Sequence, residues 1–301
     1  MRAIKVVEVA PRDGLQNEKQ SISAATKIEL VNRLSNAGFV NIEAASFVSP
    51  KWVPQMADGA AVMQGITRRP GTVYSVLTPN MQGLDAALAA GADEVVIFAA
   101  ASEAFSLKNI NCSIADSLAR FEPVARAALA AGVRLRGSIS CAMGCPYQGD
   151  VAIPQVVAVV EQLAQLGCHE IDIADTIGVG TAGHVQSVLG ACTKVYPVAQ
   201  LSGHFHDTYG QALTNIYAAL DVGISIFHSS VAGIGGCPYA KGATGNVATE
   251  DVLYLLHGLG HPTGIDLNQV AMAGDWISQQ LGRPSASRVG KALMSKMASA
   301  A

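Results

Sequence analysis

Eight short runs of β-branched and apolar residues alternate with Ala- and Leu-rich segments of helical period along the chain. Regular alternation of strands and helices is typical of βαβ units, whose strands are parallel. Eight such units predict an α/β fold, a (β/α)8 TIM barrel. A doubly wound open sheet is the alternative, because periodicity alone does not close a barrel. The expected strands cover residues 4–10, 39–47, 72–78, 94–100, 134–140, 170–176, 201–208 and 226–233.

The predicted helices, such as those over residues 26–37 and 154–166, often end in a glycine close to the next strand. Glycine adopts the positive φ that follows a helix C-terminus without steric cost. Residues after 265 predict two further helices, as far as about residue 298. No linker divides the chain, so we expect one catalytic domain over residues 1–301, with the barrel at about 4–260. Five glycines end helices in this way: Gly38, Gly91, Gly132, Gly167 and Gly223.

The composition argues against nucleic acid and membranes as partners. The 301 residues carry a formal charge of −3 and contain no basic block of the kind that binds nucleic acid. Glu8 interrupts the first apolar run, so we expect no signal-peptide core, and no stretch suits a bilayer helix. The six cysteines include no CxxC pair, which favours a reduced, cytoplasmic enzyme or binding protein.

The sequence GHFHDTYGQALTN, residues 203–215, places two histidines in the seventh strand. His204 and His206 share one face of the strand, whereas Phe205 points outward to the helices. An isolated pair of this kind favours two hydrogen-bonded core histidines. Two neighbours at the expected barrel mouth favour a metal site instead, because Asp13 offers a carboxylate oxygen and Asn246 an amide oxygen.

Other polar residues fall at the carboxyl ends of predicted strands, where barrel enzymes place their active sites. Glu43 lies inside an apolar strand and requires a partner, for which Arg12 is the natural candidate, as a structural or a catalytic pair. Asp175 either belongs to the site or caps the helix after strand six. Cys237 lies among glycines and a proline, where a thiol is expected to be exposed and mobile.

Five stretches together resemble the 3-hydroxy-3-methylglutaryl-CoA lyases, metal-dependent TIM-barrel enzymes related to Claisen-type synthases. The similarity runs from residue 4 to about residue 290, and the combination of motifs is specific. The stretches are VAPRDGLQNE, IEAASFVSPKWVPQMAD, IADTIGVGT, GHFHDTYGQALTN and AGIGGCPYAKGATGNVATED.

The resemblance implies a bacterial-type lyase that cleaves 3-hydroxy-3-methylglutaryl-CoA to acetyl-CoA and acetoacetate in leucine degradation. It implies a divalent cation, Mg²⁺ or Mn²⁺, and a cytoplasmic homodimer. A lyase for a longer branched 3-hydroxyglutaryl-CoA analogue, a Claisen synthase or aldolase on the same barrel, and a non-catalytic metal-binding protein are the alternatives. The implied metal ligands are Asp13, His204, His206 and Asn246.

The resemblance also implies catalytic roles. Arg12 would hold the thioester oxygen, and Cys237 would deliver a proton to the enolate. Asp13 and His204 are both candidates for the base. The remaining implied residues are Glu43 and Asp175, which would orient Arg12 and the ligands, Gln16, which would support them, and Lys19, which could meet the acyl-CoA phosphates.

Overall fold

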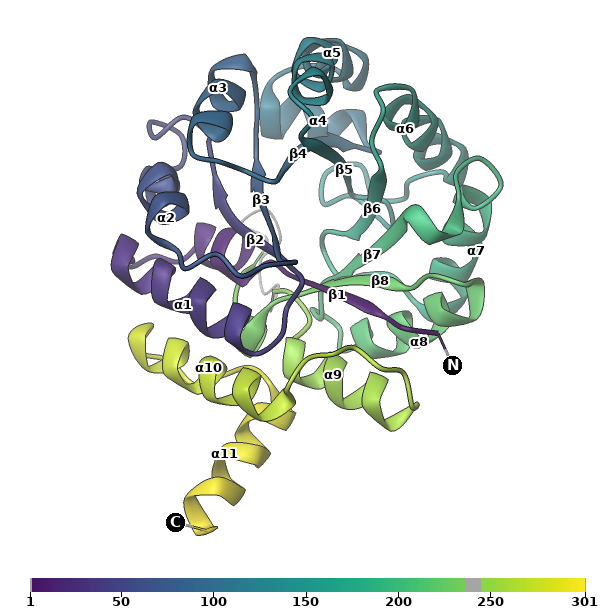
Figure 1. The fold of residues 1–301 in the computed structure, drawn as a ribbon. Helices are drawn as coiled ribbons and strands as arrows, with labels where there is room; N and C mark the ends of the chain where they lie inside the picture. Colours follow the sequence, from purple (N-terminus) through teal and green to yellow (C-terminus); the bar gives the residue numbers. More distant parts are fainter. Residues whose placement is uncertain (1, 237–244, 301) are drawn as a thin grey trace.

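The computed structural model describes residues 2–236 and 245–300, and within them eight parallel strands close a barrel (Figure 1). β1 pairs with β2 on one side and with β8 on the other, which excludes the open sheet. The TIM-barrel prediction is therefore confirmed. The strands are β1 (Lys5–Glu8), β2 (Asn41–Ser46), β3 (Val73–Leu77), β4 (Glu94–Ala100), β5 (Arg134–Ser140), β6 (Glu170–Asp175), β7 (Leu201–Phe205) and β8 (Ile226–Ser229).

Helices surround the barrel, and each strand except β8 is followed by at least one helix before the next strand (Figure 1). The two helices expected at 26–37 and 154–166 are α1 and α6, within two residues at each end. The helices are α1 (Ala24–Asn36), α2 (Gly59–Gly65), α3 (Met81–Ala89), α4 (Glu103–Ile110), α5 (Ile114–Ala130), α6 (Ile153–Gln165), α7 (Ala182–Cys192), α8 (Ala212–Val222), α9 (Thr249–Gly258), α10 (Leu267–Gln280) and α11 (Arg288–Ala300).

The glycines that the sequence placed after helices all have positive φ. The values are 104° at Gly38, 71° at Gly91, 73° at Gly132, 88° at Gly167 and 107° at Gly223. A side chain in this backbone region would collide with the backbone, so glycine ends each helix and turns the chain toward the next strand.

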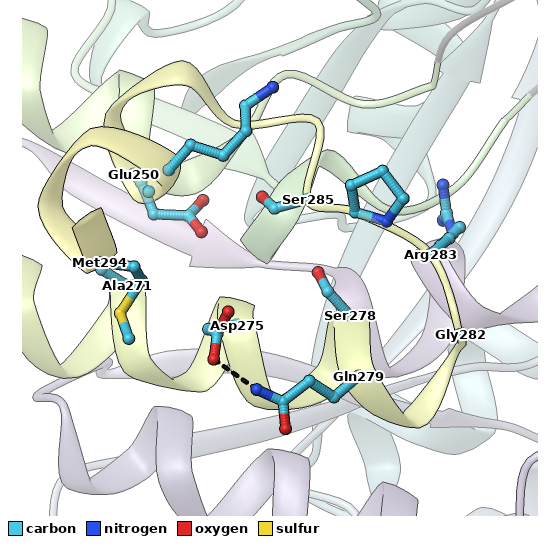
Figure 2. A pocket seen from close by; sticks show the side chains of 12 residues that line it. Glu250, Ala271, Asp275, Ser278, Gln279, Gly282, Arg283, Ser285 and Met294 are labelled. Carbon is cyan, nitrogen blue, oxygen red and sulfur yellow. Dashed lines mark hydrogen bonds between the residues drawn. The ribbon is translucent and has the colours of Figure 1, made fainter. Parts of the chain in front are cut away.

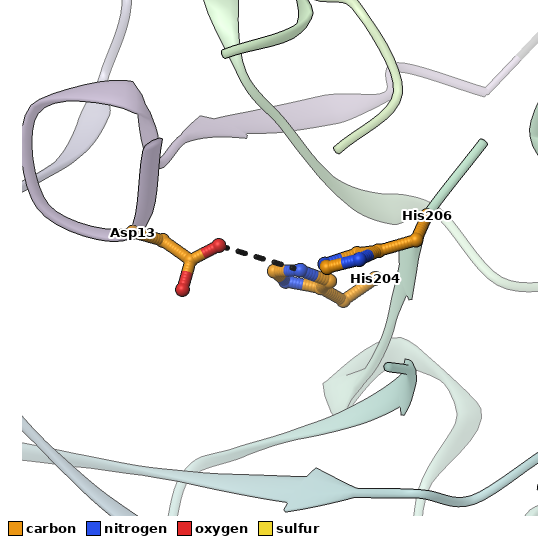
Figure 3. A group of neighbouring side chains, drawn as sticks. All are labelled: Asp13, His204 and His206. Atoms are coloured by element: carbon orange, nitrogen blue, oxygen red, sulfur yellow. Dashed lines mark ion pairs between the residues drawn. The ribbon is translucent and has the colours of Figure 1, made fainter. Parts of the chain in front are cut away.

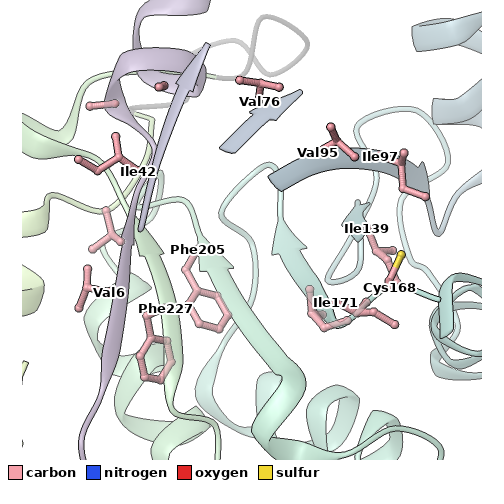
Figure 4. Packing of buried hydrophobic residues seen from close by; sticks show 14 of the residues in the cluster. Val6, Ile42, Val76, Val95, Ile97, Ile139, Cys168, Ile171, Phe205 and Phe227 are labelled. Carbon is pink, nitrogen blue, oxygen red and sulfur yellow. The ribbon is translucent and has the colours of Figure 1, made fainter. Parts of the chain in front are cut away.

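The apolar core lies between the strands and the helices. Phe205 on β7 and Phe227 on β8 are both fully buried in it, and Val6 on β1 pairs in register with Phe227 (Figure 4). A Cβ at Gly203 would lie 2.6 Å from Phe205 Cε2, so glycine is required to make room for this ring. Phe205 thus packs in the apolar layer, as predicted, and its two histidine neighbours face the other way.

The C-terminal helices α10 and α11 were expected from the sequence. α10 packs against α1 and α9, and α11 packs against α10 and α9. A pocket of about 440 Å³ lies among these helices and is lined in part by Glu250, Asp275 and Met294 (Figure 2). None of the predicted site residues that the structure describes lines this pocket. Within the described ranges, no helix has the length and apolarity that crossing a membrane requires.

Candidate metal centre and active site

His204 and His206 meet at the carboxyl end of β7. β7 ends at Phe205, so His206 lies just beyond the strand, where it forms an isolated bridge with Asn246. Both histidines are buried, and their ring centroids are 5.4 Å apart. The strand period therefore brings the two imidazoles together, as the sequence predicted.

Asp13 faces these histidines from the segment after β1, which lies two strands along from β7 in the closed barrel (Figure 3). It lies on a π-helical turn, Ala10–Gly14, that directly follows β1. Its Oδ2 atom is 3.9 Å from His204 Nε2. One nitrogen of each histidine and one carboxylate oxygen of Asp13 all lie within 4.8 Å of one another. This spacing allows the three side chains to ligate a single cation.

The protonation states of Asp13 and His206 are those that a divalent cation requires of its ligands. Burial, and then the neighbouring His204, lower the pKa of His206 to about 4, so its ring is neutral near pH 7. Burial raises the pKa of Asp13, but Arg12 and the two histidines outweigh it and hold the pKa well below its usual range. His206 Nδ1 is buried and has no hydrogen-bond partner. A neutral imidazole with an unpaired ring nitrogen beside a carboxylate is the donor set that such ions require.

Asn246 completes the group from the segment after β8. Its Nδ2 donates to Asp13 Oδ2 at 2.8 Å. Gly235 lies against the same amide with φ of 110°, and a Cβ there would be 2.7 Å from Asn246 Nδ2. Glycine at this position therefore allows the chain to pass close to the Asn246 side chain.

Arg12 is held by two carboxylates at the edge of the metal group. Its Nε donates to Glu43 Oε1, and its Nη1 donates to Asp13 Oδ1 at 2.9 Å. Glu43 lies on β2, where the pairing with β3 shifts register between Glu43 and Ala45. Such an irregularity re-aims a side chain. The Arg12–Glu43 pair expected from the sequence is present, and it fixes the guanidinium beside Asp13.

The sequence analysis did not predict a second layer of charged residues, which lies inside the barrel. Arg136 on β5 is 1% exposed, and its Nη2 donates to Glu43 Oε2 at 2.5 Å. Its Nη1 lies 3.1 Å from His228 Nε2, which in turn is 3.2 Å from Glu170 Oε1. The signal in the sequence was the alternation of charged and apolar residues, in RLR at 134–136 and EID at 170–172. The members of this layer are Arg136, Glu94, Glu170, Asp172 and His228.

Four predicted residues lie outside this contact network or outside the described chain. Asp175 accepts hydrogen bonds from the backbone of Val179 and Gly180, at 3.0 and 2.9 Å, so it orders the loop before α7. The helix cap itself is Thr181. Gln16 is partly buried, and its Oε1 has no hydrogen-bond partner. Lys19 is exposed, and Cys237 falls outside the described residues.

Comparison with known proteins identifies the family to which this chain belongs. Residues 3–277 match the sequence model of the family described as HMGL-like. This chain belongs to the HMGL-like family. A relative from Pseudomonas aeruginosa, named 3-hydroxy-3-isohexenylglutaryl-CoA/hydroxy-methylglutaryl-CoA lyase, is 59% identical over 295 residues and is matched over 98% of both chains.

Solved structures of family members have the same fold. The crystal structure of hydroxymethylglutaryl-CoA lyase from Pseudomonas aeruginosa has a TM-score of 0.96 at 59% identity, over 98% of both chains. An HMG-CoA lyase from Acinetobacter baumannii, solved in complex with coenzyme A and 3-methylmalate, has a TM-score of 0.93 at 37% identity. That match covers 96% of this chain and 95% of the other. The resemblance inferred from the five motifs is confirmed.

Proposed function

We propose that this chain is an acyl-CoA lyase that cleaves 3-hydroxy-3-methylglutaryl-CoA to acetyl-CoA and acetoacetate by divalent-metal-dependent retro-Claisen chemistry. The observation that carries this proposal is the convergence of Asp13, His204 and His206 beside Arg12, in a member of the HMGL-like family. Breaking the carbon–carbon bond requires loss of a proton from a tertiary alcohol and stabilisation of the enolate that leaves. The site contains residue types suited to both tasks.

Asp13, His204 and His206 would hold the cation, Mg²⁺ or Mn²⁺, and Asn246 would supply a fourth ligand. A divalent cation at this position supplies a Lewis acid that lowers the pKa of the substrate hydroxyl. Asp13 and His204 are also the two candidates for the base that accepts the hydroxyl proton. Since ligation weakens a base, the assignment between them stays open.

Arg12 would stabilise the negative charge that develops on the thioester oxygen. The ion pair with Glu43 and the hydrogen bond to Asp13 fix its guanidinium before substrate binds. A donor that is already oriented stabilises developing charge without reorganisation. Glu43 is therefore proposed to orient Arg12, and Cys237 is proposed to protonate the enolate.

The acyl-CoA would approach from the carboxyl ends of the strands. Gln16 would support the ligands there, and its buried Oε1 without a partner favours this role. Lys19 is exposed and would meet a CoA phosphate. Asp175 would act through the loop that its carboxylate orders. The complex of the Acinetobacter relative with coenzyme A supports an acyl-CoA substrate for this chain.

A longer branched substrate is the second candidate. The Pseudomonas relative carries 3-hydroxy-3-isohexenylglutaryl-CoA in its name beside the methyl substrate, at 59% identity. The two substrates share the hydroxyl, carboxylate and thioester that the site would bind, and they differ only in the apolar branch. We propose leucine degradation, the cytoplasm and a homodimer as the setting of the methyl activity.

Product analysis tests the proposal. Purified protein, stripped of metal with a chelator, is incubated with 3-hydroxy-3-methylglutaryl-CoA, with and without added Mg²⁺ or Mn²⁺. We expect equimolar acetyl-CoA and acetoacetate only with metal. The isohexenyl substrate in a parallel reaction compares the two acyl chains by their kcat/KM. Failure to cleave either substrate, with condensation of acetyl-CoA and an oxo acid instead, would favour a synthase.

A further inference from the structure

Asp172 is a buried carboxylate on β6 that the mechanism above does not use. It is 2% exposed, and Ser138 Oγ donates to its Oδ2 at 2.8 Å. Its Oδ1 is buried without a hydrogen-bond partner. Such a group is costly to bury, so its position requires an explanation.

The register of the barrel places Asp172 directly behind the metal group. Along β6, β7 and β8, Ala174 pairs with His204, and His204 pairs with His228. Asp172 Oδ2 lies 3.8 Å from His204 Nδ1 and 3.5 Å from His228 Nδ1. The other nitrogen of His204, Nε2, lies 3.9 Å from Asp13 Oδ2. His204 thus stands between two carboxylates, one facing each ring nitrogen.

The group of Asp172, His204 and His228 has the spacing of a metal site, since its ligand atoms lie within 4.8 Å of one another. Its charge environment argues against a cation. The Arg136 guanidinium is 3.2 Å from His228 Nδ1, the atom that also faces Asp172. A divalent ion at this point would be repelled by a buried positive charge at short range.

We infer that Asp172 is a positioning residue for His204, an inference that rests on the metal site proposed above. Its carboxylate, with Oδ1 unpartnered, favours the proton on Nδ1, because the competing charge of Asp13 at Nε2 is offset by hydrogen bonds from Arg12 and Asn246. The Nε2 lone pair is thereby left toward Asp13. A distance of 3.8 Å is too long for a hydrogen bond, so the effect is electrostatic. It acts strongly because the pair is buried. Carboxylates that face the second nitrogen of a metal-binding histidine orient the ring and fix its tautomer.

The tautomer of His204 can be measured in the metal-free protein, without any variant of Asp172. Two-bond ¹H–¹⁵N spectra of ¹⁵N-histidine-labelled protein distinguish the Nδ1–H from the Nε2–H form. The His204→Gln spectrum assigns the signals. At about pH 8, above the ordinary histidine pKa, we expect Nδ1–H for His204. An Nε2–H form, or a ring protonated at both nitrogens, would overturn the inference.

Metal affinity supplies the second test. Mn²⁺ binding is measured by isothermal titration calorimetry for the parent, Asp172→Asn and the control Glu170→Gln. Glu170 is an equally buried carboxylate on β6 that contacts Lys5 and His228 but not His204. We expect Asp172→Asn to bind Mn²⁺ about 10- to 100-fold more weakly and Glu170→Gln to bind like the parent.

The outcomes separate this inference from the proposed function. Parental affinity in Asp172→Asn would overturn the positioning role. An equal loss of Mn²⁺ affinity in both variants would also overturn the positioning role. It would show that removing any buried carboxylate of β6 weakens metal binding. A parent that binds no Mn²⁺ would refute the proposed metal site, whereas the tautomer of His204 would still test Asp172. If Asp172→Asn does not fold, the spectra of the parent decide.

Discussion

Glu43 and Arg136 form an ion pair inside the barrel, with 2.5 Å between Glu43 Oε2 and Arg136 Nη2. The same carboxylate accepts from Arg12 through its other oxygen. Burial raises the pKa of Glu43, but the two guanidinium groups outweigh it and keep the pKa below its usual value. Glu43 therefore stays ionised and links the proposed enolate-binding arginine to the interior of the barrel.

Arg12→Gln should lower kcat by about 10²–10³ with little change in KM, because the charge that Arg12 stabilises appears only in the transition state. Steady-state kinetics with 3-hydroxy-3-methylglutaryl-CoA measures both constants. Arg126→Gln, on the exposed face of α5, is the matched control and should behave like the parent. A rise in KM with unchanged kcat would show that Arg12 only binds substrate.

Arg136→Met should destabilise the protein by about 3–5 kcal/mol, because it leaves the buried Glu43 and Glu94 carboxylates without this partner. Arg136→Lys keeps the charge but loses the forked geometry, so it should fold and still reduce kcat. Urea unfolding and kinetics measure the two effects. Parental stability of Arg136→Met would show that Arg12 and His228 compensate for the lost cation.

His206→Ala should weaken Mn²⁺ binding and reduce turnover while the barrel stays folded. Its Nδ1 has no protein partner, so the substitution breaks no hydrogen bond of that atom. Calorimetric Mn²⁺ titration and circular dichroism are the measurements. His257→Ala, exposed on α9, is the control. If His206→Ala binds Mn²⁺ as tightly as the parent, the ligand assignment is wrong.

The pH dependence of stability should reflect Glu8, whose carboxylate accepts from Thr249 Oγ1 and from the backbone of Ala10 and Val231. Burial raises its pKa from 4.5 to about 7. The folded state therefore holds an extra proton between these pH values, and the free energy of unfolding falls as pH rises through them. The loss is on the order of 3 kcal/mol.

Glu8→Gln should remove this part of the slope, so it should be more stable relative to the parent at pH 8 than at pH 5. Denaturant unfolding across this range measures the difference. Burial also raises the pKa of Glu250, to about 8, so Glu250 likewise lowers the free energy of unfolding as pH rises. This contribution remains in the Glu8→Gln variant. The exposed Glu161→Gln is the control. Parallel curves for Glu8→Gln and the parent would contradict the prediction.

Cys237→Ser should keep Mn²⁺ affinity and lose most activity, because a serine hydroxyl is a far weaker acid than a thiol. The prediction rests on the sequence, since Cys237 lies outside the described residues. The other five cysteines are buried. Iodoacetamide should therefore modify Cys237 first in the native protein, and a product analogue should slow the reaction. Peptide mass mapping identifies the cysteine that is modified. Near-parental turnover of Cys237→Ser would show that Cys237 takes no part in the reaction.

The sequence by itself determined the order of the eight βα units, because apolar periodicity and helix-ending glycines are local properties. It also placed Asp13, His204 and His206 at one mouth. The carboxyl ends of parallel strands share one end of a barrel, so residues far apart in sequence converge there. The joining of Asn246 and Asp13, 233 positions apart, follows from the same rule.

Only the tertiary structure decided which buried charges pair across the interior. In the sequence, Arg136, Glu170 and His228 are polar residues within strands, and no local pattern identifies their partners. Their partners depend on barrel closure and on the register between strands, which bring Arg136 to Glu43, 93 positions away. Asp172 acquires its relation to His204 in the same way. A local pattern determines which face a side chain occupies, but the stagger of a closed barrel determines what it meets there.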